Sequence, residues 1–460
     1  MKSAQTRAST SKLRSPNRTS GLPRAGRTRS ALEPLRRSVT GKLMARTAGF
    51  NMATTMTIGL GGVIVARALG PATRGEYAAI TAWFGIACIV GQMGLPAALC
   101  FYVSKDPQRA RDYVATSRAM MIATGLVAFI GGLLLAPVLS RGNPVVADGY
   151  RIAFATSVVT FVGVAYTYAL QARHLLQWNL VRAIQPVLSL FALCALWLLK
   201  LLTLETALFI LAIALALQLG WGYWSCRRNS LAPGRGRVSL FAPLAAYGIA
   251  QIAALTPATL NAQLDQLVLS QTVAAADLGR YAVAVSLTML PMPLVAAIGN
   301  VAFPRLAAQH VVTDATRRMQ HHAVVASAGI AAVILVPLAL VAYWLIPFLF
   351  GAGYRGAVPL LWILTPGAVF LACGQVVGDL LRGRNHPTVV AWAQGLAAIF
   401  TVVLLIALLP IVGVYGAAIA STAAYGAALA VMLHSLRHLP RHARGSGWVP
   451  AITETAASDA

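Results

Sequence analysis

The chain contains twelve apolar runs, each about as long as a membrane crossing. A helix needs roughly 20 apolar residues to span the hydrocarbon core of a bilayer. The composition agrees, because the chain is 58% hydrophobic and only 11% charged, whereas soluble proteins are roughly 25% charged. The sequence therefore predicts an all-α polytopic membrane protein with about 12 transmembrane helices. The approximate spans are 47–69, 77–103, 115–139, 150–170, 184–202, 207–225, 241–270, 280–302, 322–350, 358–381, 388–409 and 416–436.

A short phrase occurs twice within this pattern. The phrases Gly75-x-Tyr77-Ala and Gly279-x-Tyr281-Ala each open an apolar run that follows another apolar run, 204 residues apart (279 minus 75). A repeat at about half the length of the hydrophobic part indicates a duplicated membrane unit. With six spans in each copy, both copies enter the membrane in the same direction. The expected architecture is two parallel six-helix lobes around a central cavity.

The lobes are expected at 47–225 and 241–436, joined by a cytoplasmic linker at 226–240. Residues 1–46 carry many basic side chains and a single acid, so they bury too little apolar surface to fold alone. They are predicted to be a basic, disordered cytoplasmic tail, either solvated or held to anionic lipid head groups. A downstream start is a further alternative, which leaves open whether 1–43 are translated. Residues 437–460 are predicted to be a second cytoplasmic tail.

The net charge of +25 is explained by membrane topology. Basic residues accumulate in cytoplasmic segments of membrane proteins. Of the 37 Lys and Arg residues, only seven fall on the side opposite the N-terminus. Both termini are therefore predicted to be cytoplasmic, and no nucleic-acid partner is predicted. The seven exceptions are Arg67, Arg74, Arg141, Arg151, Lys200, Arg280 and Arg355.

Signals of enzymatic chemistry are missing from the sequence. There is no Walker A run, no GxSxG and no HExxH, and no predicted loop is long enough to hold a catalytic domain. The five cysteines lie in or beside apolar runs without a CxxC pair, so neither a disulfide framework nor a metal site is predicted. The chain is predicted to be no enzyme and to need no cofactor.

Two acids, Asp265 and Asp379, fall inside predicted spans. A charge at the bilayer centre costs roughly 2.5–3.5 kcal/mol, so such residues usually face a cavity or a partner. On a continuous helix Asn261 and Asp265 share a face through their i,i+4 spacing. We expect the two acids to couple an ion. The alternatives are a polar cluster that ties helices together at Asp265, and a local ion pair between Asp379 and Arg382.

Further candidates are polar groups suited to a phosphorylated glycan. Membrane-depth amides suit sugar hydroxyls, although amides in helix bundles commonly just bond neighbouring helices, at about 0.6 kcal/mol each. A guanidinium such as that of Arg67 suits phosphate oxygens, although it also fits a helix C-terminus and can snorkel. At the cytoplasmic mouth, basic residues could meet a phosphorylated lipid, and ordinary positive-inside residues would look the same. The candidates for substrate binding are Arg67, Gln92, Gln251, Asn261 and Gln375, and those at the mouth are Arg173, Arg305 and Arg382.

Several segments together resemble a known family. Val65-Ala-Arg67-Ala-Leu-Gly70-Pro71 with Gly75-x-Tyr77 resembles the first-helix signature of bacterial polysaccharide flippases. These belong to the oligosaccharide exporter branch of the multidrug/oligosaccharidyl-lipid/polysaccharide superfamily. Asp265-Gln-Leu-Val-Leu with Gly279-Arg-Tyr281 resembles the opening of the family's second half. Further matches to late repeats are Phe350-Gly-x-Gly-Tyr354, Ala357-Val-Pro-Leu-Leu361 and Gly413-Val-Tyr-Gly-Ala-Ala418.

The resemblance implies a flippase that moves undecaprenyl-diphosphate-linked oligosaccharide, such as a lipopolysaccharide precursor, across the bacterial inner membrane. It implies alternating access, with Arg67 and Asp265 at motif positions, and a glycan polymerase and glycosyltransferases as pathway partners. The alternatives are a drug or cation antiporter of the same superfamily, and a non-transporting scaffold of a polysaccharide assembly complex. The glycan, the coupling ion and the oligomeric state stay open.

Overall fold

The computed structural model describes residues 27–307, 314–384 and 386–438, and in these ranges every regular element is helical. Nine helices of these ranges are long and apolar enough to cross a membrane, or ten if the bent pair Ala275–Thr288 and Met292–Gly299 counts as one span. The prediction of an all-helical membrane protein is confirmed. The α-helices are α1 (Arg27–Gly91), α2 (Leu95–Lys105), α3 (Ala110–Leu139), α4 (Pro144–Ala155), α5 (Ser157–Arg173), α6 (Leu175–Leu198), α7 (Leu204–Arg228), α8 (Phe241–Asn261), α9 (Leu264–Thr272), α10 (Ala275–Thr288), α11 (Met292–Ala307), α12 (Asp314–Phe350), α13 (Ala357–Gly383), α14 (Pro387–Val412) and α15 (Val414–His438).

Helix α1 holds what the sequence predicts as two spans. Its backbone leaves the helical region at Gly70, with φ 74° and ψ 175°, a conformation that only glycine adopts at little cost. The helix resumes at Pro71, whose fixed φ suits a first helical position. A kink therefore stands where the sequence suggests a connection over 70–76. Helix α1 begins at Arg27, inside the predicted tail 1–46, and the chain divides into two compact units at Thr47.

Four of the predicted spans are broken rather than continuous. Non-helical residues interrupt the chain at 92–94, 156, 262–263 and 289–291. The expectation of one continuous helix over 241–270 is therefore wrong, and with it the i,i+4 reasoning for Asn261 and Asp265. Such breaks occur at membrane depth only where the backbone is buried in protein or lines a polar cavity. One candidate residue, Gln92, lies in a break, and Asp265 lies just after another.

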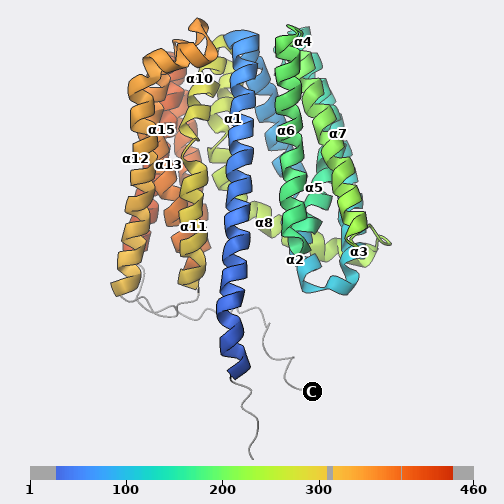
Figure 1. Ribbon diagram of the computed structural model, residues 1–460. Helices are drawn as coiled ribbons and strands as arrows, with labels where there is room; N and C mark the ends of the chain where they lie inside the picture. Colours follow the sequence, from blue (N-terminus) through green and yellow to red (C-terminus); the bar gives the residue numbers. More distant parts are fainter. Residues whose placement is uncertain (1–26, 308–313, 385, 439–460) are drawn as a thin grey trace, which may run out of the picture. The chain divides into compact units, whose positions relative to one another are not determined.

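The helices pack into two groups that follow the two halves of the sequence. In Figure 1, α5, α6 and α7 lie side by side in green, and α12, α13 and α15 lie side by side in orange and red. Most of the apolar cores fall within one half. Two cores join the halves. In one, Ala66, Ala78 and Ala79 of α1 pack with residues of α10, α12, α13 and α15. In the other, Leu244 of α8 packs with residues of α2, α3 and α5. The two halves are thus held together around the first copy of the repeated phrase and along the start of α8.

The linker at 226–240 is fixed to the first half. Arg111 Nε donates to the carbonyl oxygen of Ala232 (3.1 Å), and the Gly234 amide donates to the carbonyl oxygen of Arg111 (2.8 Å). Arg237 Nε lies 2.7 Å from Asp112 Oδ2. Leu240, at the end of the linker, and Leu244 of α8 pack in an apolar core with residues of α2, α3 and α5. The start of α8 is therefore anchored against α2 and α3.

Candidate functional site

Asp265 is a buried carboxylate with three hydrogen-bond donors. It lies in the first turn of α9, directly after the break at 262–263, and is only 3% exposed. Its Oδ1 accepts from the Gln266 amide (2.7 Å), and its Oδ2 accepts from Ser421 Oγ (3.1 Å) and from the Tyr281 hydroxyl. A carboxylate at a helix N-terminus is also favoured by the helix dipole. Hydrogen-bond donors rather than a cation hold this charge, since no Lys or Arg of the described residues lies within 4 Å of it.

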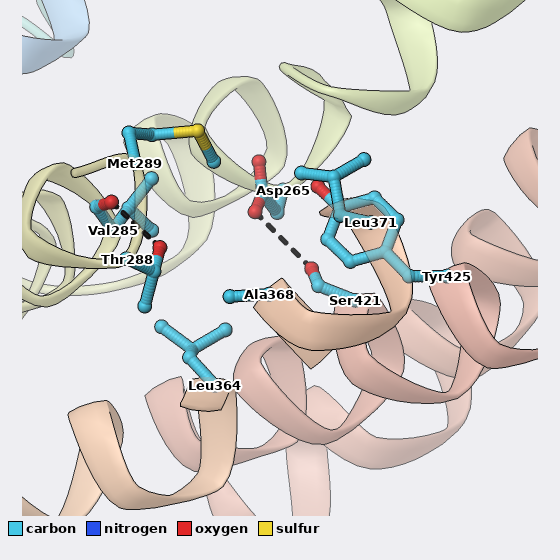
Figure 2. Close-up of a pocket in the computed structure, with 9 residues that line it drawn as sticks. All are labelled: Asp265, Val285, Thr288, Met289, Leu364, Ala368, Leu371, Ser421 and Tyr425. Carbon is cyan, nitrogen blue, oxygen red and sulfur yellow. Dashed lines mark hydrogen bonds between the residues drawn. The ribbon is translucent and has the colours of Figure 1, made fainter. Parts of the chain in front are cut away.

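A small cavity opens beside this carboxylate, as Figure 2 shows. Its volume of about 10 Å³ is room for about one water molecule. The polar groups on its wall are carboxyl and hydroxyl oxygens. Oxygen atoms of this type coordinate hard cations, and a carboxylate can also bind a proton. The cavity is far too small for a sugar. Its lining residues are Asp265, Val285, Thr288, Met289, Leu364, Ala368, Leu371, Ser421 and Tyr425.

Asn261 belongs to a separate amide and hydroxyl cluster. Its Nδ2 donates to Gln394 Oε1 (3.2 Å), and its Oδ1 accepts from Thr401 Oγ1 (3.0 Å). Both partners lie on α14, and Asn261 is 3% exposed. These bonds tie the end of α8 to α14, which is the interhelical role common for amides in bundles. Asn261 and Asp265 therefore lie on either side of the 262–263 break, each in its own network.

The duplicated phrases meet in space. Gly75 and Gly279 face each other so closely that a Cβ at Gly75 would lie 2.9 Å from the Gly279 nitrogen, and a Cβ at Gly279 would lie 3.0 Å from the Gly75 nitrogen. Tyr281, two residues further on, is the donor to Asp265. The buried carboxylate is thus only one side chain away from the contact between the halves.

Further contacts join the halves near this point. Arg67 Nη1 donates to the carbonyl oxygen of Phe348 (2.6 Å) at the C-terminal end of α12, and Tyr354 Oη donates to that of Ala66 (2.9 Å). Arg141 Nη1 donates to the carbonyl oxygen of Val273 (3.1 Å). All these residues lie on the side that the charge pattern assigns to the cell exterior. Arg67 therefore bonds to the C-terminal end of another helix, α12, and does not line the cavity at Asp265.

The remaining candidates are scattered. Asp379 Oδ1 lies 2.8 Å from Arg382 Nη1, which is the local ion pair weighed as its alternative. Gln92 and Gln251 are partly buried in the 92–94 break and in α8, and Gln375 is exposed on α13. Arg173 and Arg382 are exposed at the ends of α5 and α13. The side chain of Arg305 lies outside the described residues. None of these contacts the cavity at Asp265.

Sequence reasoning missed three residues of note. Tyr281 was recognised as a motif residue but not as a partner of Asp265. Ser421 carries no signal in the sequence, since a serine in an apolar helix is common. Arg182 lies on α6, just outside the span predicted at 184–202. An arginine within an apolar run, with no acid near it in sequence, was the available signal.

Comparison with solved structures places this architecture in one class. A multidrug resistance MATE family transporter of the MOP superfamily, in an inward-facing conformation, superposes with a TM-score of 0.69 and 14% identity, over 83% of this chain and 94% of that chain. The lipid II flippase MurJ, in an inward closed conformation, gives 0.73 and 12%, over 86% and 88%. A MOP superfamily transporter from Pyrococcus furiosus gives 0.60 and 13%, over 86% and 95%. The fold is that of the MOP superfamily.

The family follows from the sequence. The model of the polysaccharide biosynthesis protein family matches residues 47–310, more than half of the chain. The chain therefore belongs to the polysaccharide biosynthesis protein family, as its motifs suggest. A search of curated protein sequences found no significant match.

Proposed function

We propose that the protein is a flippase that moves undecaprenyl-diphosphate-linked oligosaccharide from the cytoplasmic to the outer leaflet of the bacterial inner membrane, without enzymatic chemistry. Membership of the polysaccharide biosynthesis family supports the glycan. The likeness to MurJ, a lipid II flippase, supports the class of transport. The distribution of Lys and Arg supports a cytoplasmic location for both termini.

The transporter is proposed to have twelve spans in two lobes of six. The kink at Gly70 divides α1 into two spans, the second of which continues into α2. The pairs α4 with α5, α8 with α9, and α10 with α11 each form one broken span. The other helices, α3, α6, α7 and α12 to α15, each form one. This assignment gives lobes at 47–225 and 241–436, as the duplication predicts.

Alternating access requires that the lobes separate at one end while they meet at the other. The contacts through Gly75, Gly279, Arg67 and Tyr354 fit a transporter closed on the outer side. A central, substrate-sized cavity between the lobes is then proposed to open towards the cytoplasm.

The observation that carries the ion coupling is the bond between Tyr281 and Asp265. Tyr281 belongs to the phrase that packs against the other lobe, and Asp265 faces a cavity for one water molecule. Binding of a proton or a cation at Asp265 would weaken its acceptance of the Tyr281 hydroxyl, because the carboxylate charge strengthens that bond. The ion would thereby loosen the outer contact. We assign Asp379, which pairs with Arg382, a structural role.

A leaflet-exchange assay tests the proposed function. The purified protein is reconstituted into vesicles with a fluorescent undecaprenyl-diphosphate oligosaccharide, and a membrane-impermeant quencher reports the label in the outer leaflet. We expect faster exchange than in protein-free vesicles. Exchange equal to that of protein-free vesicles, with the native glycan, would exclude the flippase.

The second candidate is a drug or cation antiporter, which the fold shared with MATE transporters and the buried carboxylate both favour. The same vesicles, loaded with a cationic dye and given a proton or sodium gradient, distinguish the two. Dye movement driven by the gradient, without exchange of the lipid, would favour the antiporter. A scaffold would move neither.

A further inference from the structure

Helix α6 has an apolar face turned away from the protein. Successive residues of an α-helix are about 100° apart, so residues spaced by three, four or seven lie on one face. A row with this spacing is at least 37% exposed, and such a row suits contact with lipid. Its members are Leu176, Leu180, Val187, Phe191 and Leu198.

The opposite face of α6 is polar. Trp178, Arg182, Gln185 and Ser189 follow one another at helical spacing and lie about 180° from the centre of the apolar row. We call these four residues the α6 polar stripe. Each is partly exposed, although the stripe faces away from the lipid side. The stripe therefore lies on the side of α6 that is turned towards the rest of the protein, and its side chains are not fully packed there.

Arg182 is the charged member of the stripe. Its guanidinium lies over the Trp178 ring, 4.4 Å from the centroid, and Nη1 is 3.3 Å from Asn51 Oδ1 of α1. Among the described residues, no carboxylate lies within 4 Å of it. Arg182 is seven residues from the start of α6, which is about 10 Å along the helix. A charge at such a depth calls for a counter-charge or a polar cavity.

Neighbouring groups also have unused hydrogen-bonding capacity. Trp178 Nε1 and Asn179 Oδ1 are buried and have no hydrogen-bond partner among the described residues. Within the described part of the chain, the one side-chain hydrogen bond of Gln185 Nε2 and Ser189 Oγ is to each other, at 3.4 Å. Buried polar groups are normally paired, so unpaired ones indicate a missing partner.

Two explanations of Arg182 compete. An arginine at this depth can snorkel along lipid to the head-group region. Such a side chain would start from the lipid-exposed face, whereas Arg182 starts from the opposite one. Its guanidinium is also held by Trp178 and Asn51, towards α1. A planar, stacked guanidinium with free N–H groups is suited to phosphate oxygens.

We propose that the α6 polar stripe binds the phosphate-bearing head group of the transported lipid. Arg182 contacts the phosphate, and Gln185 and Ser189, deeper in the membrane, contact sugar hydroxyls. The assignment rests on the proposed function for its ligand, and it adds a site that lies in the first half alone, on α6 and α1. It also replaces Arg67 as the anion contact, since Arg67 is bonded to the end of α12.

Thiol labelling tests which way the stripe faces. In a variant with the five native cysteines replaced, single cysteines are introduced by Gln185→Cys and Ser189→Cys, and on the apolar row by Leu180→Cys and Phe191→Cys. A charged, membrane-impermeant thiol reagent is added to the cytoplasmic face of inside-out vesicles. We expect labelling of the two stripe variants and not of the two apolar-row variants. Equal labelling of all four, or of the apolar row alone, would overturn the proposal.

Protection from labelling tests the ligand. Undecaprenyl diphosphate should slow labelling of the Gln185→Cys variant about tenfold. This protection should vanish when Arg182→Gln is added, because the variant lacks the charged donor to the phosphate oxygens. Undecaprenol, which lacks phosphate, should not protect. Protection by phosphatidylglycerol vesicles alone, or by inorganic diphosphate alone, would assign the site to a membrane phospholipid or to a free anion instead. Protection by undecaprenol would overturn the role of phosphate.

A binding measurement on the protein with its native cysteines tests the same site even if the cysteine-free variant does not fold. Purified Arg182→Gln and Arg109→Gln are compared with wild type for binding of fluorescent undecaprenyl diphosphate. Arg109 is an exposed arginine paired with Asp106 at the same side of the membrane. We expect about tenfold weaker binding for Arg182→Gln only. Equal binding by all three proteins would refute the site. Arg182-dependent binding without leaflet exchange would instead leave the site standing and refute the proposed function.

Discussion

Gly75 and Gly279, the glycines of the two repeated phrases, pack against each other at the contact between the halves. A Cβ on either would lie within 3.0 Å of the other's backbone nitrogen and would overlap a carbonyl oxygen, that of Ala275 or Pro71. Neither glycine has a positive φ, so the requirement is one of space. The duplication therefore brings two copies of one phrase face to face. In an alternating-access cycle this contact must open and re-form.

Gly279→Ala should weaken this contact. The added methyl has no room and meets backbone atoms that cannot rotate away, and overpacking of this kind costs about 1–3 kcal/mol. We expect a lower melting temperature and labelling from the outer side of a cysteine introduced nearby. Gly329→Ala is the matched control, because a Cβ at Gly329 meets nothing within 4 Å. An unchanged melting temperature in Gly279→Ala would show that the halves do not meet here.

Tyr281→Phe should leave Asp265 one donor short. The buried carboxylate would keep Ser421 and the Gln266 amide, and loss of a bond to a buried charged group costs roughly 1.5–3 kcal/mol. Chemical denaturation in detergent should report lower stability. Tyr415→Phe, at an exposed tyrosine of α15, is expected to have no effect. Equal loss in both variants would show that the Tyr281 hydroxyl has no special role.

The linker should resist proteolysis until its anchor is removed. Arg237 is 56% exposed and its partner Asp112 is 18% exposed, so the pair is worth only about 0.2–1 kcal/mol. Arg111→Ala together with Arg237→Ala removes the pair and the Arg111 side-chain bond to Ala232. We expect faster tryptic cleavage after Arg227 or Arg228 in the double variant. Rapid cleavage already in wild type would contradict the docked linker.

The stability of the protein should depend on pH through two histidines. His174 and His386 precede α6 and α14, outside the spans, and burial followed by the neighbouring Arg173 or Arg384 lowers the pKa of each below 6.5. The unfolded chain then binds protons more strongly than the folded protein. Stability should be unaffected by these groups above about pH 6.5 and should fall as pH drops through and below that value. The melting temperature of His174→Gln with His386→Gln should fall less on acidification. An equal fall in wild type and variant would contradict this.

The sequence predicted the helical class, the approximate spans and the family because long apolar runs and repeated phrases are local signals. It did not predict the breaks at 92–94 and 262–263. At the first of these, Gly94 lies close to the backbone of Gly248 in α8, a contact between residues far apart in the sequence. Tyr281 and Ser421 bond to Asp265 across 16 and 156 residues of sequence, so their roles depend on the tertiary fold. Asp265 was a candidate from the sequence because an acid within an apolar run is rare. The bond of Arg67 to the end of α12 could not be predicted, because its partner lies 281 residues away in the sequence.

The most direct test of the coupled flippase is gradient-driven leaflet exchange by the Asp265→Asn variant. Asp265→Asn keeps the size of the side chain and removes the charge that would bind the ion. Asp148→Asn, at an exposed ion pair with Arg151, is the control. The account predicts that a proton or sodium gradient accelerates exchange in wild type and Asp148→Asn and has no effect in Asp265→Asn at equal protein level. Acceleration of the same size in all three proteins would contradict it.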